Sequence, residues 1–357
     1  IIRLLFLPSL FFSCSEAETN RKISINVEDN VDTIYYSSFV KDIDYLTLNT
    51  QDSCLISGIE KIFADDDTIF VQGRRREGVL VFTKSGDFVK QINYIGNGPE
   101  EFMSISAFAI DPLLNHICIY DMSSLKILKY TYQGDFVKSY RTDNLYAGDF
   151  TVTSNEDNLF ILPFHDSKQT SGVWLADTNG VTKKILRDDA PKNNEFEYTG
   201  NYYNRSEEGL YYYDRNWDDF SYVTKDTLTK LFRFDLKQKI PQAIRIKRDW
   251  RMEELIGYTT MSSFANATNY LLIVYYIFGD KPDYQWKWVF LDKSNNDVVC
   301  SEHLINDIDP IQSDSKQLYY LNDSTWCRLL NMEGDDCNLN LQILHLKDIL
   351  IFVSHKH

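Results

Sequence analysis

Three consecutive arginines form the most conspicuous chemical group in this chain. Arg74, Arg75 and Arg76 follow an apolar segment in a chain of 357 residues that carries a formal net charge of −15. A guanidinium group presents several N–H donors in one plane and matches a carboxylate or a phosphate. The cluster is therefore a candidate anion-binding loop, although the favoured interpretation is a solvated loop that neutralises neighbouring acids.

Aromatic residues in polar segments are candidates for sugar binding. The segment 278–288 (FGDKPDYQWKW) contains Tyr284 and Trp286, and Trp217 lies in a second polar segment. Aromatic rings offer a large, rigid apolar surface on which a sugar ring can stack. Trp286 and Trp288 alternate as residues of a strand do, so at least one of them is expected to pack inside the protein.

Motifs for catalysis are sparse. The six histidines show no H-x-x-x-H or comparable metal-ligand spacing, and two of them lie in the terminal HKH. The chain has no G-x-S-x-G motif and no glycine-rich phosphate loop. Glu100 and Glu101 are adjacent, whereas the two acids of a glycosidase are separated across the substrate. The residues therefore favour a binding protein without a cofactor or a metal over an enzyme.

A repeated hairpin pattern indicates which structural elements hold these residues in place. Residues 79–92 read VLVFTKSGDFVKQI, and residues 127–140 read ILKYTYQGDFVKSY. Each copy alternates apolar and polar residues, breaks at a Gly-Asp turn and alternates again, which is typical of a β-hairpin. A hairpin that recurs every ~40–50 residues predicts the blades of a propeller.

Weaker copies of the hairpin extend the pattern over most of the chain. Two further strand-like segments precede each hairpin, which gives five units of four strands at 59–92, 105–140, 148–186, 196–234 and 260–302. Strand-like segments at 42–48, 317–322 and 339–347 remain and would complete a sixth unit. We therefore predict an all-β fold, a six-bladed β-propeller of four-stranded antiparallel blades closed by an N-terminal strand near 43–48. The segment 238–259 is expected to be a partly helical insertion, and 322–338 to be irregular.

The N-terminal segment has the features of a targeting signal. Arg3 precedes an apolar stretch over 4–12, and the small residues Ser13 and Cys14 follow it. We expect a signal peptide at 1–13, a linker at 14–40, the propeller at 41–348 and a tail at 349–357. Removing residues 1–13 takes away Arg3 and changes the net charge from −15 to −16. Such a charge disfavours nucleic acid, whose phosphates require basic surfaces.

Two short motifs resemble those of known families. The segment 11–14 (FFSC) resembles the lipobox of bacterial lipoproteins, and the acidic segment 15–18 is similar to the surface-export signal of Bacteroidota lipoproteins. This resemblance implies that Cys14 carries a lipid and that the protein lies on the outer membrane, facing outward and touching the membrane only through the anchor. An ordinary cleaved signal is the alternative.

The segment 94–102 (YIGNGPEEF), with the repeats on both sides of it, resembles the six-bladed β-propeller lipoproteins of Bacteroidota, distant relatives of NHL-repeat propellers. The residues that match their G-x-G-P-x-E-[FY] signature are Gly96, Gly98, Pro99, Glu101 and Phe102. The resemblance covers about residues 40–347 and implies a fold and a location more than an activity. For the loop itself we expect a structural role between two blades.

These observations favour a monomeric binding module at the cell envelope. The face that carries 74–76, the loop at 96–102 and the aromatic tips would recognise a glycan, a peptide or an envelope protein. The alternative is an extracellular hydrolase or lyase in which histidine and acidic residues of the central channel hold a metal. Cys327 and Cys337 could form a disulfide, although spacing does not determine the pairing.

Overall fold

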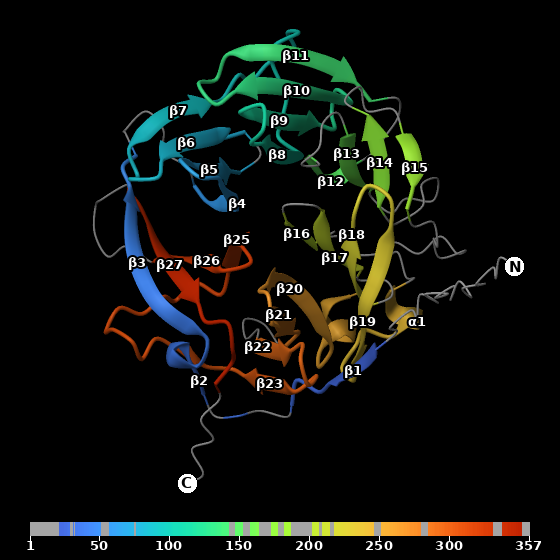
Figure 1. Ribbon diagram of the computed structural model, residues 1–357. Coiled ribbons are helices and arrows are strands. Elements are labelled where there is room, and N and C mark those ends of the chain that lie inside the picture. The colour runs from blue at the N-terminus through green and yellow to red at the C-terminus, as the bar shows by residue number, and fades with distance from the viewer. Residues whose placement is uncertain are drawn as a thin grey trace, which may run out of the picture.

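Antiparallel sheets arranged around one axis make up the protein. The computed structural model describes residues 21–28, 31, 33–50, 57–74, 76–142, 147–152, 158–163, 173–177, 182–186, 202–206, 209–214, 218–245, 251–279, 285–330 and 338–351. Within these ranges the strands form six sheets of four or five strands and one two-stranded ladder. The sheets stand around the axis as the blades of a propeller do (Figure 1). The prediction of an all-β propeller with antiparallel four-stranded blades is confirmed.

Three sheets follow one another along the chain. The strands of each sheet are given in order from the axis outward. Sheet 1 consists of β4 (Ile59–Ala64), β5 (Thr68–Gly73), β6 (Val79–Thr83) and β7 (Phe88–Ile92). Sheet 2 consists of β8 (Ala107–Asp111), β9 (His116–Asp121), β10 (Lys126–Thr131) and β11 (Phe136–Arg141). Sheet 3 consists of β12 (Ala147–Val152), β13 (Asn158–Pro163), β14 (Trp174–Asp177) and β15 (Thr182–Ile185).

Two of the remaining sheets include a strand from the N-terminal region. Sheet 4 consists of β16 (Tyr202–Arg205), β17 (Leu210–Asp214), β18 (Asp219–Val223), β19 (Leu228–Leu236) and β1 (Arg21–Ile25). Sheet 5 consists of β20 (Thr259–Asn266), β21 (Tyr270–Ile277), β22 (Gln285–Asp292) and β23 (Val298–Ser301). Sheet 6 consists of β25 (Leu318–Asn322), β26 (Thr325–Leu330), β27 (Leu339–Leu346) and β3 (Val40–Leu48).

Short elements connect the sheets. β2 (Ile34–Tyr35) pairs in parallel with β24 (Leu304–Ile305), and a 3₁₀ helix covers Tyr36–Ser38. The expected insertion contains α1 (Gln242–Arg245) and a 3₁₀ helix at Met252–Leu255. No helix in the ranges given above is long and apolar enough to cross a membrane.

Glycines in the hairpin turns explain the repeated sequence pattern. Gly86 and Gly134 have φ angles of +91° and +88°, which residues with a β-carbon rarely adopt. In each turn the glycine N–H donates to the carbonyl of the threonine three residues before it, at 2.9 Å. Next to each turn the pairing register shifts, between Val81 and Phe82 of β6 and between Lys129 and Tyr130 of β10, because the strand after the turn carries one extra residue. The repeated Gly-Asp step therefore encodes one turn type with a bulge.

The core lies between neighbouring sheets. The buried apolar residues of the described chain form six clusters, each of which joins two adjacent sheets. β21 illustrates the pattern, because Leu271 and Ile273 face sheet 4 whereas Leu272 and Val274 face sheet 6. One cluster also joins sheet 6 to sheet 1 through Leu48. Strands buried on both faces need continuous apolar sequence, which accounts for the dense segment at 269–278.

The N-terminal region differs from the expected linker at 14–40. β1 pairs in parallel with β19, and Val27, Tyr36 and Phe39 are buried. The alternating sequence at 21–27 supplies one apolar face that packs into the cluster between sheets 4 and 5. The described residues between 21 and 40 therefore belong to the packed body, while residues 1–20 lie outside the described ranges.

The last sheet contains a strand that the sequence pattern did not predict. β26 falls within 322–338, which was expected to be irregular, and it pairs with both β25 and β27. Trp326 and Cys327 are fully buried in it. Cys327 is a free thiol, and Cys337 lies outside the described residues. The expected strand near 43–48 lies within β3, which pairs antiparallel with β27.

We predict that removing residues 1–50 lowers the free energy of unfolding by more than about 5 kcal/mol. The deletion exposes the edge of β27 and removes buried residues such as Phe39 and Leu48, each of which contributes about 2–5 kcal/mol. Urea unfolding followed by circular dichroism measures the loss, and size-exclusion chromatography detects association through the open edge. A chain that begins at Arg21 is the control and should keep the stability of the full chain. Equal unfolding midpoints for the two truncations would contradict the prediction.

A candidate ligand-binding cavity on the propeller axis

A cavity of about 990 Å³ lies where the innermost strands meet. Every sheet contributes to its wall, through β4, β8, β12, β16, β20 and β25. These strands surround the axis in Figure 1. The turns that lead from the first to the second strand of sheets 1, 4 and 6 also line the cavity, so it extends to the face of the ring that these turns form.

An ion pair crosses one side of the cavity. Lys61 on β4 places its Nζ atom against the Oδ2 atom of Asp149 on β12, two sheets away. The side chains of Lys61 and Asp149 are 27% and 11% exposed, so solvent screens the pair only in part. Burial raises the pKa of Asp149, and the Lys61 ammonium opposes this rise. The same ammonium lies 5.2 Å from the ring centre of Tyr203.

β16 contributes an aromatic ring and a second cation to the same wall. Tyr203 and Arg205 lie two residues apart, so their side chains leave the strand on the same face. The Tyr203 hydroxyl donates to the carbonyl of Phe150 at 2.9 Å, and Arg205 Nη1 donates to the carbonyl of Ile110 at 3.2 Å. Burial lowers the pKa of Arg205, while Tyr203 and Asp111 oppose this change. Side chains of sheet 4 thus reach sheets 2 and 3.

A polar network with several tyrosines borders the other side of the cavity. The Tyr320 hydroxyl donates to Asp323 Oδ1 at 2.9 Å, and Asn266 Nδ2 donates to the same oxygen at 2.7 Å. Lys293 Nζ donates to Asn266 Oδ1 at 2.6 Å and lies 5.5 Å from the ring centre of Tyr211. Burial lowers the pKa of Lys293 to about 8, with Asp323 acting in the opposite direction. These groups mostly satisfy one another.

Arg74 and Arg76 of the candidate anion-binding loop do not line this cavity. Arg74 and Arg76 are exposed in the turn between β5 and β6, at the far end of β5 from the turn that borders the cavity. The Arg74 backbone N–H donates to Glu77 Oε2 at 2.8 Å, which fixes the turn locally. Of the other expected site residues, Cys14, Arg75, Trp217 and Tyr284 lie outside the described ranges.

Trp286 packs partly within the protein. Its ring centre lies 5.6 Å from that of Tyr276 on the neighbouring strand, and the side chain contacts the cluster between sheets 5 and 6. Trp288, two residues further along β22, is fully buried. The alternation in the sequence therefore reflects a strand, as expected for at least one of the two residues.

The loop at 96–102 is held by contacts within itself and with sheet 2. Glu101 Oε2 accepts from the Gly98 N–H at 2.9 Å, and Phe102 is fully buried between sheets 1 and 2. The backbone carbonyls of the loop accept from sheet 2, where Lys126 binds Gly98 and Glu101, Tyr130 binds Glu100, and Ser139 binds Pro99. A β-carbon on Gly96 would overlap the Glu101 carboxylate. These contacts give each signature residue a structural role.

The described residues offer no metal centre of the kind that the alternative enzyme hypothesis requires. Within the described ranges, no group of three or more His, Cys, Asp or Glu side chains could hold a metal ion. His303 is exposed and follows β23, the outermost strand of its sheet, so it does not face the channel.

The cavity residues were missed, although the sequence contains a signal for them. Lys61 lies in IEKIF, Asp149 in AGDFTV and Arg205 in YYNR, all innermost strands in which a charged side chain interrupts an apolar or aromatic pattern. In a strand next to the axis, such a residue faces the channel or a partner across it. Examining the first strand of each repeat for charges would have identified these residues.

We predict that Gly96→Ala lowers the free energy of unfolding by about 1–3 kcal/mol, because the added methyl group displaces the Glu101 carboxylate from its bond to Gly98. In a Glu101→Ala background the same substitution should cost clearly less, since the overlapping group is gone. Urea unfolding of the two single variants and the double variant completes the cycle. Strictly additive losses would show that Glu101 does not restrict Gly96.

Two solved structures from Bacteroides share the fold of this chain. One is a candidate exported protein of Bacteroides fragilis, with 16% identity, a TM-score of 0.71 and coverage of 92% of this chain and 100% of that chain. The other is a member of the DUF4221 family from Bacteroides vulgatus, with 8% identity, a TM-score of 0.55 and coverage of 86% and 97%. Among curated proteins none matches. A family model described as "Domain of unknown function (DUF4934)" matches residues 22–334, and the chain therefore belongs to this family.

Proposed function

We propose that this protein is an exported six-bladed propeller that works as a binding module, with its ligand in the axial cavity. We count each of the six sheets as one blade, with β3 closing the ring against β27. The apolar segment at 4–12 and the likeness to a candidate exported protein of Bacteroides fragilis support export.

The axial cavity is the observation that carries this proposal. Its volume of about 990 Å³ lies at the upper end of the ~300–1,000 Å³ that small-molecule sites occupy. The wall combines aromatic surface from Tyr203 with hydrogen-bonding groups from Lys61 and Arg205. Such a wall suits an oligosaccharide or a short peptide, because these ligands present both apolar faces and polar edges. We place the ligand here and not on the face with Arg74 and Arg76, which is exposed and forms no part of the cavity wall.

A blocking substitution tests the cavity directly. Ser262 is half-buried on β20 and lines the cavity, so Ser262→Trp should fill part of it. We predict that a ligand found on glycan and peptide arrays loses at least about tenfold in affinity for this variant, which corresponds to about 1.4 kcal/mol. The double variant Arg74→Ala/Arg76→Ala is the control on the opposite face and should bind as the original chain does. Normal binding by Ser262→Trp, with loss in the control, would move the site to the arginine loop.

We further propose that Cys14 carries the lipid of an outer-membrane lipoprotein whose propeller faces outward. The cysteine follows the apolar segment after one serine and lies seven residues before Arg21, the first residue of β1. Several acyl chains are needed for stable anchoring, because one chain binds a membrane only weakly. We expect Cys14→Ser to move the protein from the membrane fraction to the soluble fraction of the cells. Retention of the variant in the membrane fraction would rule out this anchor.

A further inference from the structure

Two cations on the cavity wall have more donors than the protein uses. An ammonium group has three N–H donors and a guanidinium group has five. Within the described residues, Lys61 Nζ bonds only to Asp149, and the Arg205 guanidinium bonds only to the carbonyl of Ile110. Both side chains are half-buried and line the cavity, so their remaining donors are open to a ligand there.

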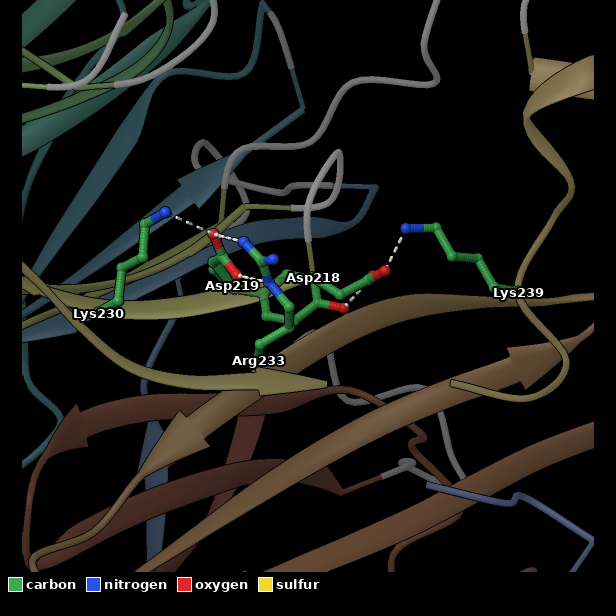
Figure 2. A network of polar contacts seen from close by, with 6 residues as sticks. Asp218, Asp219, Lys230, Arg233 and Lys239 are labelled. Carbon is green, nitrogen blue, oxygen red and sulfur yellow. Dashed lines mark hydrogen bonds and ion pairs between the residues drawn. The ribbon is translucent and has the colours of Figure 1, made fainter. Parts of the chain in front are cut away.

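Another arginine of this protein shows how a guanidinium group pairs with a carboxylate. Arg233 on β19 directs Nε and Nη2 at the two carboxylate oxygens of Asp219, at 2.6 and 3.0 Å (Figure 2). Asp219 is fully buried and also lies 3.4 Å from Lys230. Arg205 has no carboxylate within ion-pair distance in the described part of the chain, although Asp111 is near enough to influence its pKa. Arg205 therefore lacks the partner that Arg233 has.

The acids of the cavity wall are already engaged or face bulk solvent. Asp149 binds Lys61, and Asp323 accepts from Tyr320 and Asn266. Asp65 accepts from the backbone N–H groups of Asp67 and Thr68 at 3.2 and 2.9 Å. Glu60 and Asp66, which also line the cavity, are exposed. None of these carboxylates takes up the donors of Arg205.

A neutral group on the cavity wall also lacks a partner. Ser263 lines the cavity, and its buried hydroxyl oxygen has no hydrogen bond to any described residue. Rotation of this side chain about its Cα–Cβ bond would turn the hydroxyl toward a ligand in the cavity. The ring of Tyr203 lies beside the Lys61 ammonium and offers a flat surface at the same place. Cations, a free hydroxyl and an aromatic ring are together the groups that bind an acidic sugar.

We infer that the axial cavity binds an acidic oligosaccharide and holds a sugar carboxylate between Lys61 and Arg205. This inference rests on the proposed binding function and specifies its ligand class. The carboxylate would accept from the guanidinium and from the two unused donors of Lys61, which keeps its bond to Asp149. The sugar ring would lie against Tyr203, with its hydroxyl groups toward Ser263.

The test compares an acidic trisaccharide with its uncharged methyl ester. Calorimetric titration with tri-galacturonate and with its methyl ester measures what the carboxylates contribute, because esterification leaves the sugar rings unchanged. The original chain should bind the acid at least tenfold more tightly than the ester. Arg205→Gln should lower the affinity for the acid to that for the ester, without changing the affinity for the ester.

Two further variants keep the result interpretable. Lys61→Gln/Asp149→Asn replaces the ion pair with a neutral pair, which avoids an isolated buried charge, and it should also abolish the preference for the acid. Arg74→Gln removes an exposed arginine on the opposite face and should leave both affinities unchanged. Urea unfolding midpoints equal to that of the original chain exclude loss of the fold as the cause.

Three outcomes would overturn the inference. Equal affinities for the acid and the ester would show that the cavity does not distinguish a charged ligand from a neutral one. Loss of both affinities in Arg205→Gln would show the same. The binding function itself would stand in either case. Absence of binding to every acidic oligosaccharide of a panel that also includes glucuronate and mannuronate oligomers would reject the ligand class. The proposed binding function is tested separately. It would fail if Ser262→Trp did not change the affinity for a bound ligand.

Discussion

Asn266 joins three sheets near the propeller axis, and the positions of the inner strands depend on its hydrogen bonds. Its backbone N–H donates to Asn204 Oδ1 on β16 at 2.8 Å, and its side-chain amide donates to Asp323, just after β25, at 2.7 Å. Its carbonyl accepts from Trp326 Nε1 at 2.9 Å. Because Asn266 is fully buried, an unpaired group at any of these atoms would cost about 1–3 kcal/mol. These polar bonds thus join sheets 4, 5 and 6 in addition to the apolar clusters that lie between them.

The local signals in the sequence predicted most of the fold. Gly86 and Gly134 specify the same turn, and the units expected at 59–92 and 105–140 lie within two residues of the observed bounds of sheets 1 and 2. β1 and β26 were missed for different reasons. β1 is a parallel strand at the outer edge of sheet 4, and no hairpin pattern in the sequence predicts such a pairing. β26 follows a polar turn at 322–324, and the buried Arg328 interrupts its apolar sequence, which hides a strand whose centre is buried.

The cavity was harder to predict because its contacts join distant parts of the chain. Lys61 meets Asp149 across 88 residues, and Arg205 meets Ile110 across 95. The ring brings such residues together, but local patterns do not specify which side chains cross the axis. Arg74 and Glu101 were conspicuous in the sequence for local reasons, since the first belongs to a charged run and the second to a signature. In the structure each makes contacts within its own loop.

The net charge of −15 constrains how an acidic ligand could bind to this protein. Long-range attraction would not bring an anion to a strongly acidic surface, and at physiological salt interactions between exposed charges are screened beyond about 8 Å. The binding energy must therefore come from short contacts inside the cavity, where Lys61 and Arg205 are partly removed from water. Such contacts act mainly on the lifetime of the complex and on its specificity, and less on the rate of encounter. The two cations must therefore outweigh the repulsion that the excess of acidic groups exerts on any anion.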